Sequence, residues 1–332
     1  GGFFMISKSK TFILLGIFIL SLFLITGCDS GSSADADIVY YYNGSIGMGD
    51  FISVELNLSQ NQLKYENRIT GDKGSSDFTK LSNGMYSMGD DLFVTLEDQV
   101  LLATDVDGKE GEMLITTLKE IDSAYGDEII GKYNIITSLE GARGTVEIKA
   151  NNKVDITFED SNLDDLSDLD YSYNESFKAI EIVEEGADGS FRHYGVFLEG
   201  GIGVFDSYWK ETPEASWQGD GMSVLVREDS SIDLEDFAGS YTYIDVDADY
   251  GSFEIEYVDE SSLNLVVPNE GSILLENIDL DKGLASFSAS IAEDQPEDWS
   301  MMLLPGEVIV LGSETPHTFG GDAGGLLIGI RN

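Results

Sequence analysis

Alternation of apolar and polar side chains predicts β-strands through most of this chain. The segments 145–149, 154–158 and 252–257 each alternate with a period of two, which is typical of strands with one face in a core and one face in water. No segment keeps the i, i+3, i+4, i+7 spacing of a long amphipathic helix. The acidic segment 161–170 is expected to form a loop, with a helical turn as the alternative. The pattern predicts an all-β protein.

Similar segments recur in the same order, which indicates tandem repeats. Gly131-Lys132-Tyr133 and Gly239-Ser240-Tyr241 begin two repeats and lie 108 residues apart, and residues 39–42 form a weaker first copy. Each repeat also contains a hairpin signal, in which two apolar residues flank three turn-forming residues. These hairpins lie at 96–100, 198–202 and 304–308. A closing strand follows each hairpin and ends in a basic residue, at Lys119, Arg227 and Arg331.

This repetition divides the chain into five predicted parts. They are a signal peptide over 1–27, a flexible tether over 28–37, and three β modules over 38–128, 129–234 and 235–332. Each module is expected to be an antiparallel barrel or sandwich. The modules resemble the lipocalin-like or avidin-like up-and-down barrels that are repeated in some bacterial lipoproteins, on the strength of the strand pattern and the Gly-x-Tyr openings. A single β-propeller built from the same hairpins is the alternative.

The N-terminal segment predicts export and a lipid anchor. Lys8 and Lys10 precede an apolar run over 12–25, and the run ends in Leu24-Ile25-Thr26-Gly27-Cys28. This ending resembles the lipobox of bacterial lipoproteins, which implies a diacylglyceryl group on the thiol of Cys28 and cleavage just before it. Cys28 is the single cysteine and has no disulfide partner in the chain. We therefore expect a cell-envelope protein, lipid-anchored to the inner or outer membrane and facing the periplasm or the exterior.

The charge of the chain restricts its partners. The formal net charge is −44, and removal of the signal peptide takes away two lysines and no acidic residue, which moves the charge to −46. Such a field repels nucleic acid and anionic lipid headgroups. A hydrophobic content of 42% is enough to build cores, so we expect the chain to fold outside the tether.

The residues that carry catalysis are scarce. The only histidines are His193 and His317, and the chain has no Gly-x-Ser-x-Gly, His-Glu-x-x-His or phosphate-binding glycine motif. We therefore predict a protein that is not an enzyme. A carboxylate-pair glycosidase is the alternative that 62 acidic residues leave open.

One acidic segment partly matches a calcium loop. Asp245, Asp247 and Asp249 would be its first, third and fifth ligands and Glu256 its twelfth, whereas Tyr250 stands where the sharp turn needs glycine. Solvated acidic turns are the competing interpretation. No other cofactor is predicted.

Aromatic residues near the hairpins are the remaining candidates for binding. Tyr208, Trp209 and Trp217 are expected in one loop of the second module, and His317 and Phe319 in the corresponding loop of the third. Rings on such loops suit glycans or partner proteins, although they could instead plug a barrel mouth.

Two functions follow from these features. One is a non-enzymatic binding or adhesion lipoprotein, and the other is a structural envelope protein made of repeats. Hollow barrel interiors would favour small ligands, and filled interiors would favour adhesion or structure.

Overall fold

The computed structural model describes residues 38–47, 50–89, 91–105, 113–138, 142–159, 165–185, 189–199, 201–245, 250–268, 271–290, 297–316 and 324–332. Within them the chain forms antiparallel β-strands and two short 3-10 helices, η1 (Asp127–Ile129) and η2 (Leu234–Phe237). The prediction of an all-β protein is confirmed.

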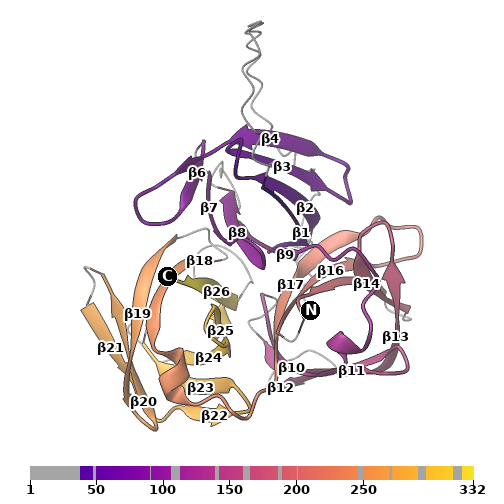
Figure 1. Ribbon diagram of the computed structural model, residues 1–332. Helices are drawn as coiled ribbons and strands as arrows, with labels where there is room; N and C mark the ends of the chain where they lie inside the picture. The colour runs from indigo at the N-terminus through magenta and orange to yellow at the C-terminus, as the bar shows by residue number, and fades with distance from the viewer. Residues whose placement is uncertain are drawn as a thin grey trace, which may run out of the picture.

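The strands form three separate curved sheets, which are named barrels 1, 2 and 3 here (Figure 1). Barrel 1 contains β1 (Val39–Ile46), β2 (Asp50–Asn57), β3 (Gln62–Asn67), β4 (Lys73–Asp77), β5 (Thr79–Lys80), β6 (Tyr86–Met88), β7 (Asp91–Leu96), β8 (Val100–Asp105) and β9 (Met113–Lys119). Barrel 2 contains β10 (Gly131–Thr137), β11 (Arg143–Lys149), β12 (Lys153–Glu159), β13 (Leu166–Asn174), β14 (Ala179–Glu185), β15 (Ser190–Phe197), β16 (Ile202–Lys210) and β17 (Gln218–Arg227). Barrel 3 contains β18 (Gly239–Asp245), β19 (Tyr250–Asp259), β20 (Ser262–Val267), β21 (Gly271–Leu275), β22 (Asp279–Asp281), β23 (Leu284–Ala289), β24 (Glu297–Leu304), β25 (Val308–Pro316) and β26 (Gly324–Arg331).

In each barrel the first strand pairs with the last, so the sheet curls round on itself. The pairs are β1 with β9, β10 with β17, and β18 with β26. A propeller would instead hold separate blades around one axis. The prediction of three tandem antiparallel β modules is therefore confirmed, as one closed barrel and two sheets that curl into open barrels, and the propeller alternative is wrong.

The barrels differ at one seam. In barrel 2 the strand β13 pairs with β12 through its first half and with β14 through its second half, which closes the sheet. In barrels 1 and 3 the equivalent stretch is split into β4 and β5, and into β21 and β22, and the two ends of the sheet are not paired. The loop expected over 161–170 is wrong for residues 166–170, which belong to β13. These residues pair with β12 despite their negative charge, because Lys149 and Lys153 form ion pairs with Asp168 and Asp170.

The Gly-x-Tyr openings and the basic ends of the closing strands meet in barrels 2 and 3. The guanidinium of Arg227 lies 5.1 Å from the ring centre of Tyr133, and that of Arg331 lies 5.3 Å from the ring of Tyr241. Each tyrosine hydroxyl donates a hydrogen bond to the carbonyl of the residue that ends the 3-10 helix, Ile129 at 2.8 Å and Phe237 at 2.9 Å. These contacts hold η1 at one end of barrel 2 and η2 at one end of barrel 3.

Apolar side chains of the chain itself fill each barrel. Tyr42, Leu56 and Phe93 are fully buried in the cluster inside barrel 1. Barrels 2 and 3 enclose similar clusters, with Phe197 inside barrel 2 and Phe253 inside barrel 3. The inward positions alternate along the strands, as the period of two predicts.

A fourth core lies where the three barrels meet (Figure 1). It is built from the outward faces of strands in all three barrels, for example by Leu102, Val204 and Val310. The first strand of each barrel packs against the next barrel around the centre, in the order β1 on β16, β10 on β25, and β18 on β8. Three head-to-tail contacts therefore close into a ring, in the way that rotational symmetry closes an oligomer.

Candidate functional site

The segment that contains Tyr208, Trp209 and Trp217 is mainly strand. β16 continues to Lys210 and β17 begins at Gln218, so the connection covers only 211–217. The ladder extends this far because Tyr208 and Trp209 pair with Gly219 and Gln218 beyond a register shift. Successive residues of β16 point to opposite faces of the sheet, so Tyr208 and Trp209 are not presented together. Trp217 packs against the cluster that contains Tyr208.

Tyr208 belongs to the contact between barrels 1 and 2. Its side chain is 2% exposed in the central core. Its hydroxyl accepts a hydrogen bond of 2.6 Å from the backbone N–H of Phe51 in barrel 1. Two residues earlier, Asp206 is fully buried and accepts a 2.6 Å hydrogen bond from the hydroxyl of Ser45. Burial raises the pKa of Asp206 well above its ordinary range. Tyr208 thus connects two barrels and is not on an exposed surface.

Trp217 is half-buried and has two cations over its ring. The guanidinium carbon of Arg192 and the ammonium nitrogen of Lys210 each lie 4.6 Å from the ring centre, within the range of a cation–π interaction. Arg192 also pairs with Glu181 at 3.3 Å. No pattern in the sequence pointed to Arg192, because β15 brings it to Trp217 from 25 residues away.

Trp209 and His193 occupy neighbouring strands of barrel 2. Trp209 pairs with Phe191, and the ring of Phe191 lies parallel to that of His193. Nδ1 of His193 lies 2.8 Å from Oγ of Ser207. Burial lowers the pKa of His193 to about 4, so the imidazole is neutral at physiological pH. The neighbouring carboxylate, Asp206, points to the opposite face of β16 and does not orient this pair.

The proposed calcium ligands are not brought together. Asp245 is the last residue of β18. Glu256 lies at the opposite end of this hairpin, because it follows Ile255, which pairs with Gly239 at the start of β18. At ~3.3 Å per residue this separates the two by roughly 20 Å along the hairpin. The Glu256 carboxylate accepts a 2.7 Å hydrogen bond from Asn264 instead. Asp247 and Asp249 lie outside the described residues, and the described residues contain no cluster of three or more candidate metal ligands.

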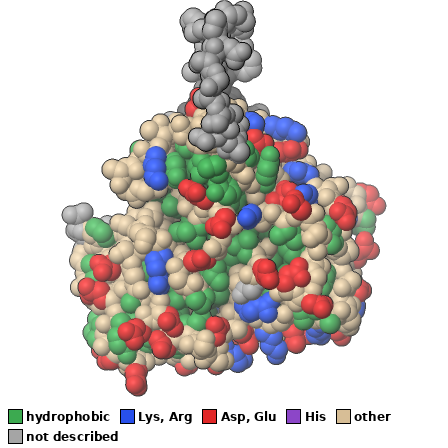
Figure 2. Space-filling model, in the orientation of Figure 1, with side chains coloured by type: hydrophobic (Ala, Val, Ile, Leu, Met, Phe, Trp, Pro, Cys, Tyr) green, Lys and Arg blue, Asp and Glu red, His purple; other side chains and the backbone are tan. Residues whose placement is uncertain are grey.

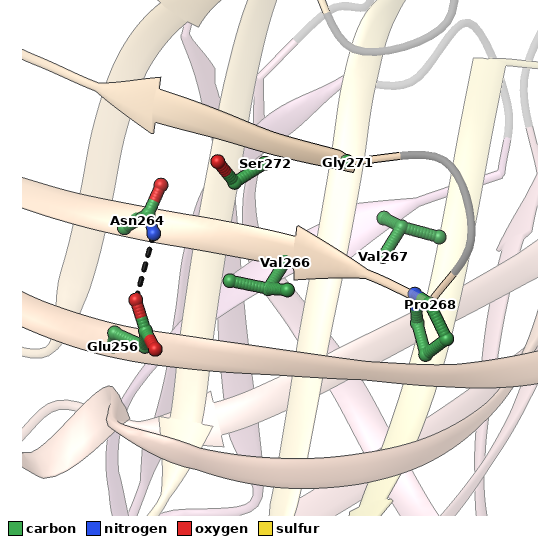
Figure 3. A pocket seen from close by; sticks show the side chains of 7 residues that line it. All are labelled: Glu256, Asn264, Val266, Val267, Pro268, Gly271 and Ser272. Carbon is green, nitrogen blue, oxygen red and sulfur yellow. Dashed lines mark hydrogen bonds between the residues drawn. The ribbon is translucent and has the colours of Figure 1, made fainter.

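A shallow groove lies on the outer face of barrel 3 (Figure 3). Val266, Val267 and Pro268 form its apolar part, and Glu256 and Asn264 form its polar end. Gly271 and Ser272 of β21 complete it. No residue in the groove was singled out for partner binding from the sequence, because the pairing of β19, β20 and β21 assembles it.

Acidic side chains are spread over the face of the molecule in Figure 2, with lysine and arginine side chains between them. The candidates Cys28, His317 and Phe319 lie outside the described residues. In the described part of the chain no helix has the length and apolar character needed to cross a membrane.

No protein-family model matches this chain, and no curated protein matches it. Among solved structures it is similar to a double mutant of the vaccine antigen Transferrin Binding Protein B from Haemophilus parasuis Hp5. That similarity has a TM-score of 0.30 and 7% identity, and covers 88% of this chain and 76% of the other. Intact Ap-TbpB, with its N and C lobes, gives a TM-score of 0.26 at 7% identity, over 89% of this chain and 77% of that one. TM-scores of this size carry no weight for function.

Proposed function

We propose that this chain is an exported lipoprotein, anchored through Cys28, that binds a partner through the outer surfaces of its barrels and is not an enzyme. The anchor is supported by the lipobox-like ending at Cys28 and by the absence of a second cysteine. The partner is a glycan or a protein of the cell envelope.

The observation that carries this proposal is the filling of the barrels. Apolar side chains of the chain itself occupy all three interiors, and close packing leaves little room for a small ligand there. The surfaces and connections outside the barrels are therefore the parts that a partner can reach. Of these, the cluster of Trp217, Arg192 and Lys210 combines a large ring with two cations in a chain of net charge −44.

A structural role in the envelope is the second candidate. It is favoured by the central core, which joins the three barrels, and by Tyr208, whose ring serves that contact. A protein that only extends a surface would need no exposed binding residue.

The anchor is tested by Cys28→Ser in cells supplied with labelled fatty acid. Loss of the label from the variant is expected, since the thiol is the acceptor. Equal labelling of variant and parent would rule out Cys28 as the site.

The binding role is tested with arrays of glycans and purified envelope proteins. Arg192→Gln and Lys210→Gln are expected to weaken a detected interaction about tenfold each, which corresponds to ~1.4 kcal/mol, while the melting temperature stays unchanged. Lys282→Gln in barrel 3 is the matched control. A parent protein that binds nothing on either array would leave only the structural role.

A further inference from the structure

The strand β21 forms one end of the sheet of barrel 3. It pairs with β20, and within the described residues no strand pairs with its other edge. A strand at the end of a sheet presents backbone N–H and C=O groups that can pair with another extended chain. Proteins normally protect such edges with charge, proline or a bulge. The three barrels of this chain can be compared directly, because each has an equivalent strand.

In barrel 1 the equivalent strand, β4, is polar and carries a charge. Its sequence is Lys-Gly-Ser-Ser-Asp, and Lys73 pairs with Glu66 at 3.1 Å. Followed along the ladders from the equivalent residues Tyr42 and Tyr241, the position of Leu274 in β21 corresponds to that of Asp77 in β4. A lysine at the edge opposes pairing, since an added strand would cover its charge.

In barrel 2 the equivalent part of β13 is distorted. The register shifts between β12 and β13, and Asp168 has a positive φ of 55°. The backbone groups of Asp168 have partners already, because its N–H donates to Asp155 and its carbonyl accepts from Lys153, each at 2.8 Å. A bulge of this kind ends regular pairing.

In barrel 3 none of these devices occurs. The sequence of β21 is Gly-Ser-Ile-Leu-Leu, without charge or proline. Ile273 packs against the interior cluster and Leu275 belongs to it. Leu274 points away from this interior and is 51% exposed. The groove formed by Val266, Val267 and Pro268 lies on the other side of β21, over its partner strand β20 (Figure 3). At the free edge an added strand would therefore contact the unpaired backbone groups of β21 and the exposed side chain of Leu274.

The charge around this edge selects the kind of segment that fits. Between residues 239 and 281 the chain has eleven acidic residues and no lysine or arginine. Glu276 and Asp279 are exposed just after β21. A second copy of this chain, also at −44, would be repelled. A segment in which lysine or arginine alternates with apolar residues would be attracted.

We propose that the outer edge of β21 binds an extended, basic segment of another protein by β-strand addition. The inference rests on the proposed binding role and names the class of partner. Backbone hydrogen bonds to the edge supply affinity in this mode, and side chains beside Ser272 and Leu274 supply preference.

The test uses the mature chain and a fluorescein-labelled eight-residue peptide of alternating lysine and valine, with binding followed by anisotropy. Leu274→Lys, which places a cation on the edge, is expected to weaken binding at least tenfold. Val258→Lys is the matched control, because Val258 is 49% exposed and lies on β19, which β20 separates from β21. The control is expected to change binding less than twofold. A peptide N-methylated at every second residue is expected to bind at least tenfold more weakly, since it lacks the N–H groups of one edge.

Several outcomes would overturn the proposal. One is that the parent does not bind the peptide. An equal loss in both lysine variants, or equal binding of the N-methylated peptide, would indicate attraction by charge alone. A parent dimer that Leu274→Lys dissociates in sedimentation would assign the edge to a second copy instead. These readouts depend neither on Cys28 nor on Trp217, so their failure is distinguishable from failure of the proposed function.

Discussion

The contact between barrels 1 and 2 and the contact between barrels 2 and 3 use equivalent strands but different chemistry. The first contains the buried pair Ser45 and Asp206, joined by a 2.6 Å hydrogen bond. At the equivalent positions the second has Ile136 against Gly312, where a β-carbon on the glycine would overlap the Ile136 side chain. Two barrels can therefore pack in the same arrangement in two ways. The centre of the contact can hold a buried hydrogen bond between polar side chains, or it can hold an apolar side chain against a glycine backbone.

The contact between barrels 1 and 2 is also rich in aromatic residues. Phe51 of barrel 1 stacks on Phe177 of barrel 2, with ring centres 5.2 Å apart and planes 8° apart. Tyr194 packs against both rings and against Tyr208. This difference indicates that the contact between barrels 1 and 2 depends on a few large side chains. The contact between barrels 2 and 3 depends instead on a position without a side chain, Gly312.

The largest expected effect is that of removing the ring of Tyr208. Tyr208→Ala should lower the free energy of unfolding by ~3–5 kcal/mol, as deletion of a buried aromatic side chain does. Tyr208→Phe keeps the packing and removes the hydroxyl, which accepts from the N–H of Phe51 and also interacts with Asp206, and should cost ~1–3 kcal/mol. Urea unfolding measures both. Equal losses in the two variants would mean that the hydrogen bond, and not the packing, dominates this contact.

Gly312→Val tests the second contact. The added side chain should lower the free energy of unfolding by ~1–3 kcal/mol, because it overfills a closely packed site. Ile136→Ala in the same chain frees space and should recover part of the loss, which a double-mutant cycle detects. A Gly312→Val protein as stable as the parent would show that the barrels can move apart here without cost.

The buried carboxyl of Asp206 predicts a pH dependence specific to the first contact. Its folded pKa is raised by burial, so the native state holds the proton above pH ~4, where the unfolded carboxyl loses it. Stability should therefore fall as the pH rises from ~4 toward the folded pKa, by at most ~1.4 kcal/mol per pH unit from this group. In urea unfolding at pH 4–8, Asp206→Asn should remove the part of the pH dependence of the free energy of unfolding that comes from this carboxyl. Parallel curves for variant and parent would contradict a raised pKa.

The smallest effect is expected at the contact between barrels 3 and 1. There, a side-chain hydrogen bond of 2.8 Å runs from the amide of Gln99 to the carboxylate of Glu307 and joins two hairpin turns. Gln99→Ala should change the free energy of unfolding by less than ~1.5 kcal/mol, the usual size for one such bond. A larger loss, measured by thermal unfolding beside Gln60→Ala as a surface control, would show that the turns hold the ring of barrels closed.

The strand pattern predicted most of the fold and little of the candidate site. Alternating segments such as 145–149 became strands, and the Gly-x-Tyr openings became the first strands of barrels 2 and 3, because alternation reports local burial on one face. Tyr208 and Trp209 were expected in a loop, but the ladder of β16 and β17 continues through them. The number of residues that pair in a ladder depends on the partner strand as well. The periodicity of one segment contains no information about its partner.

The sequence by itself determined the all-β class, the repetition and the period of each strand, since these depend on local side-chain alternation and recurring turns. Tertiary structure alone decided which outward faces are buried. Val204 and Val310 resemble any exposed apolar positions until another barrel covers them, and Asp206 resembles any surface carboxylate until Ser45 meets it. Contacts between residues far apart in sequence depend on how three barrels pack together, and no local pattern encodes that packing.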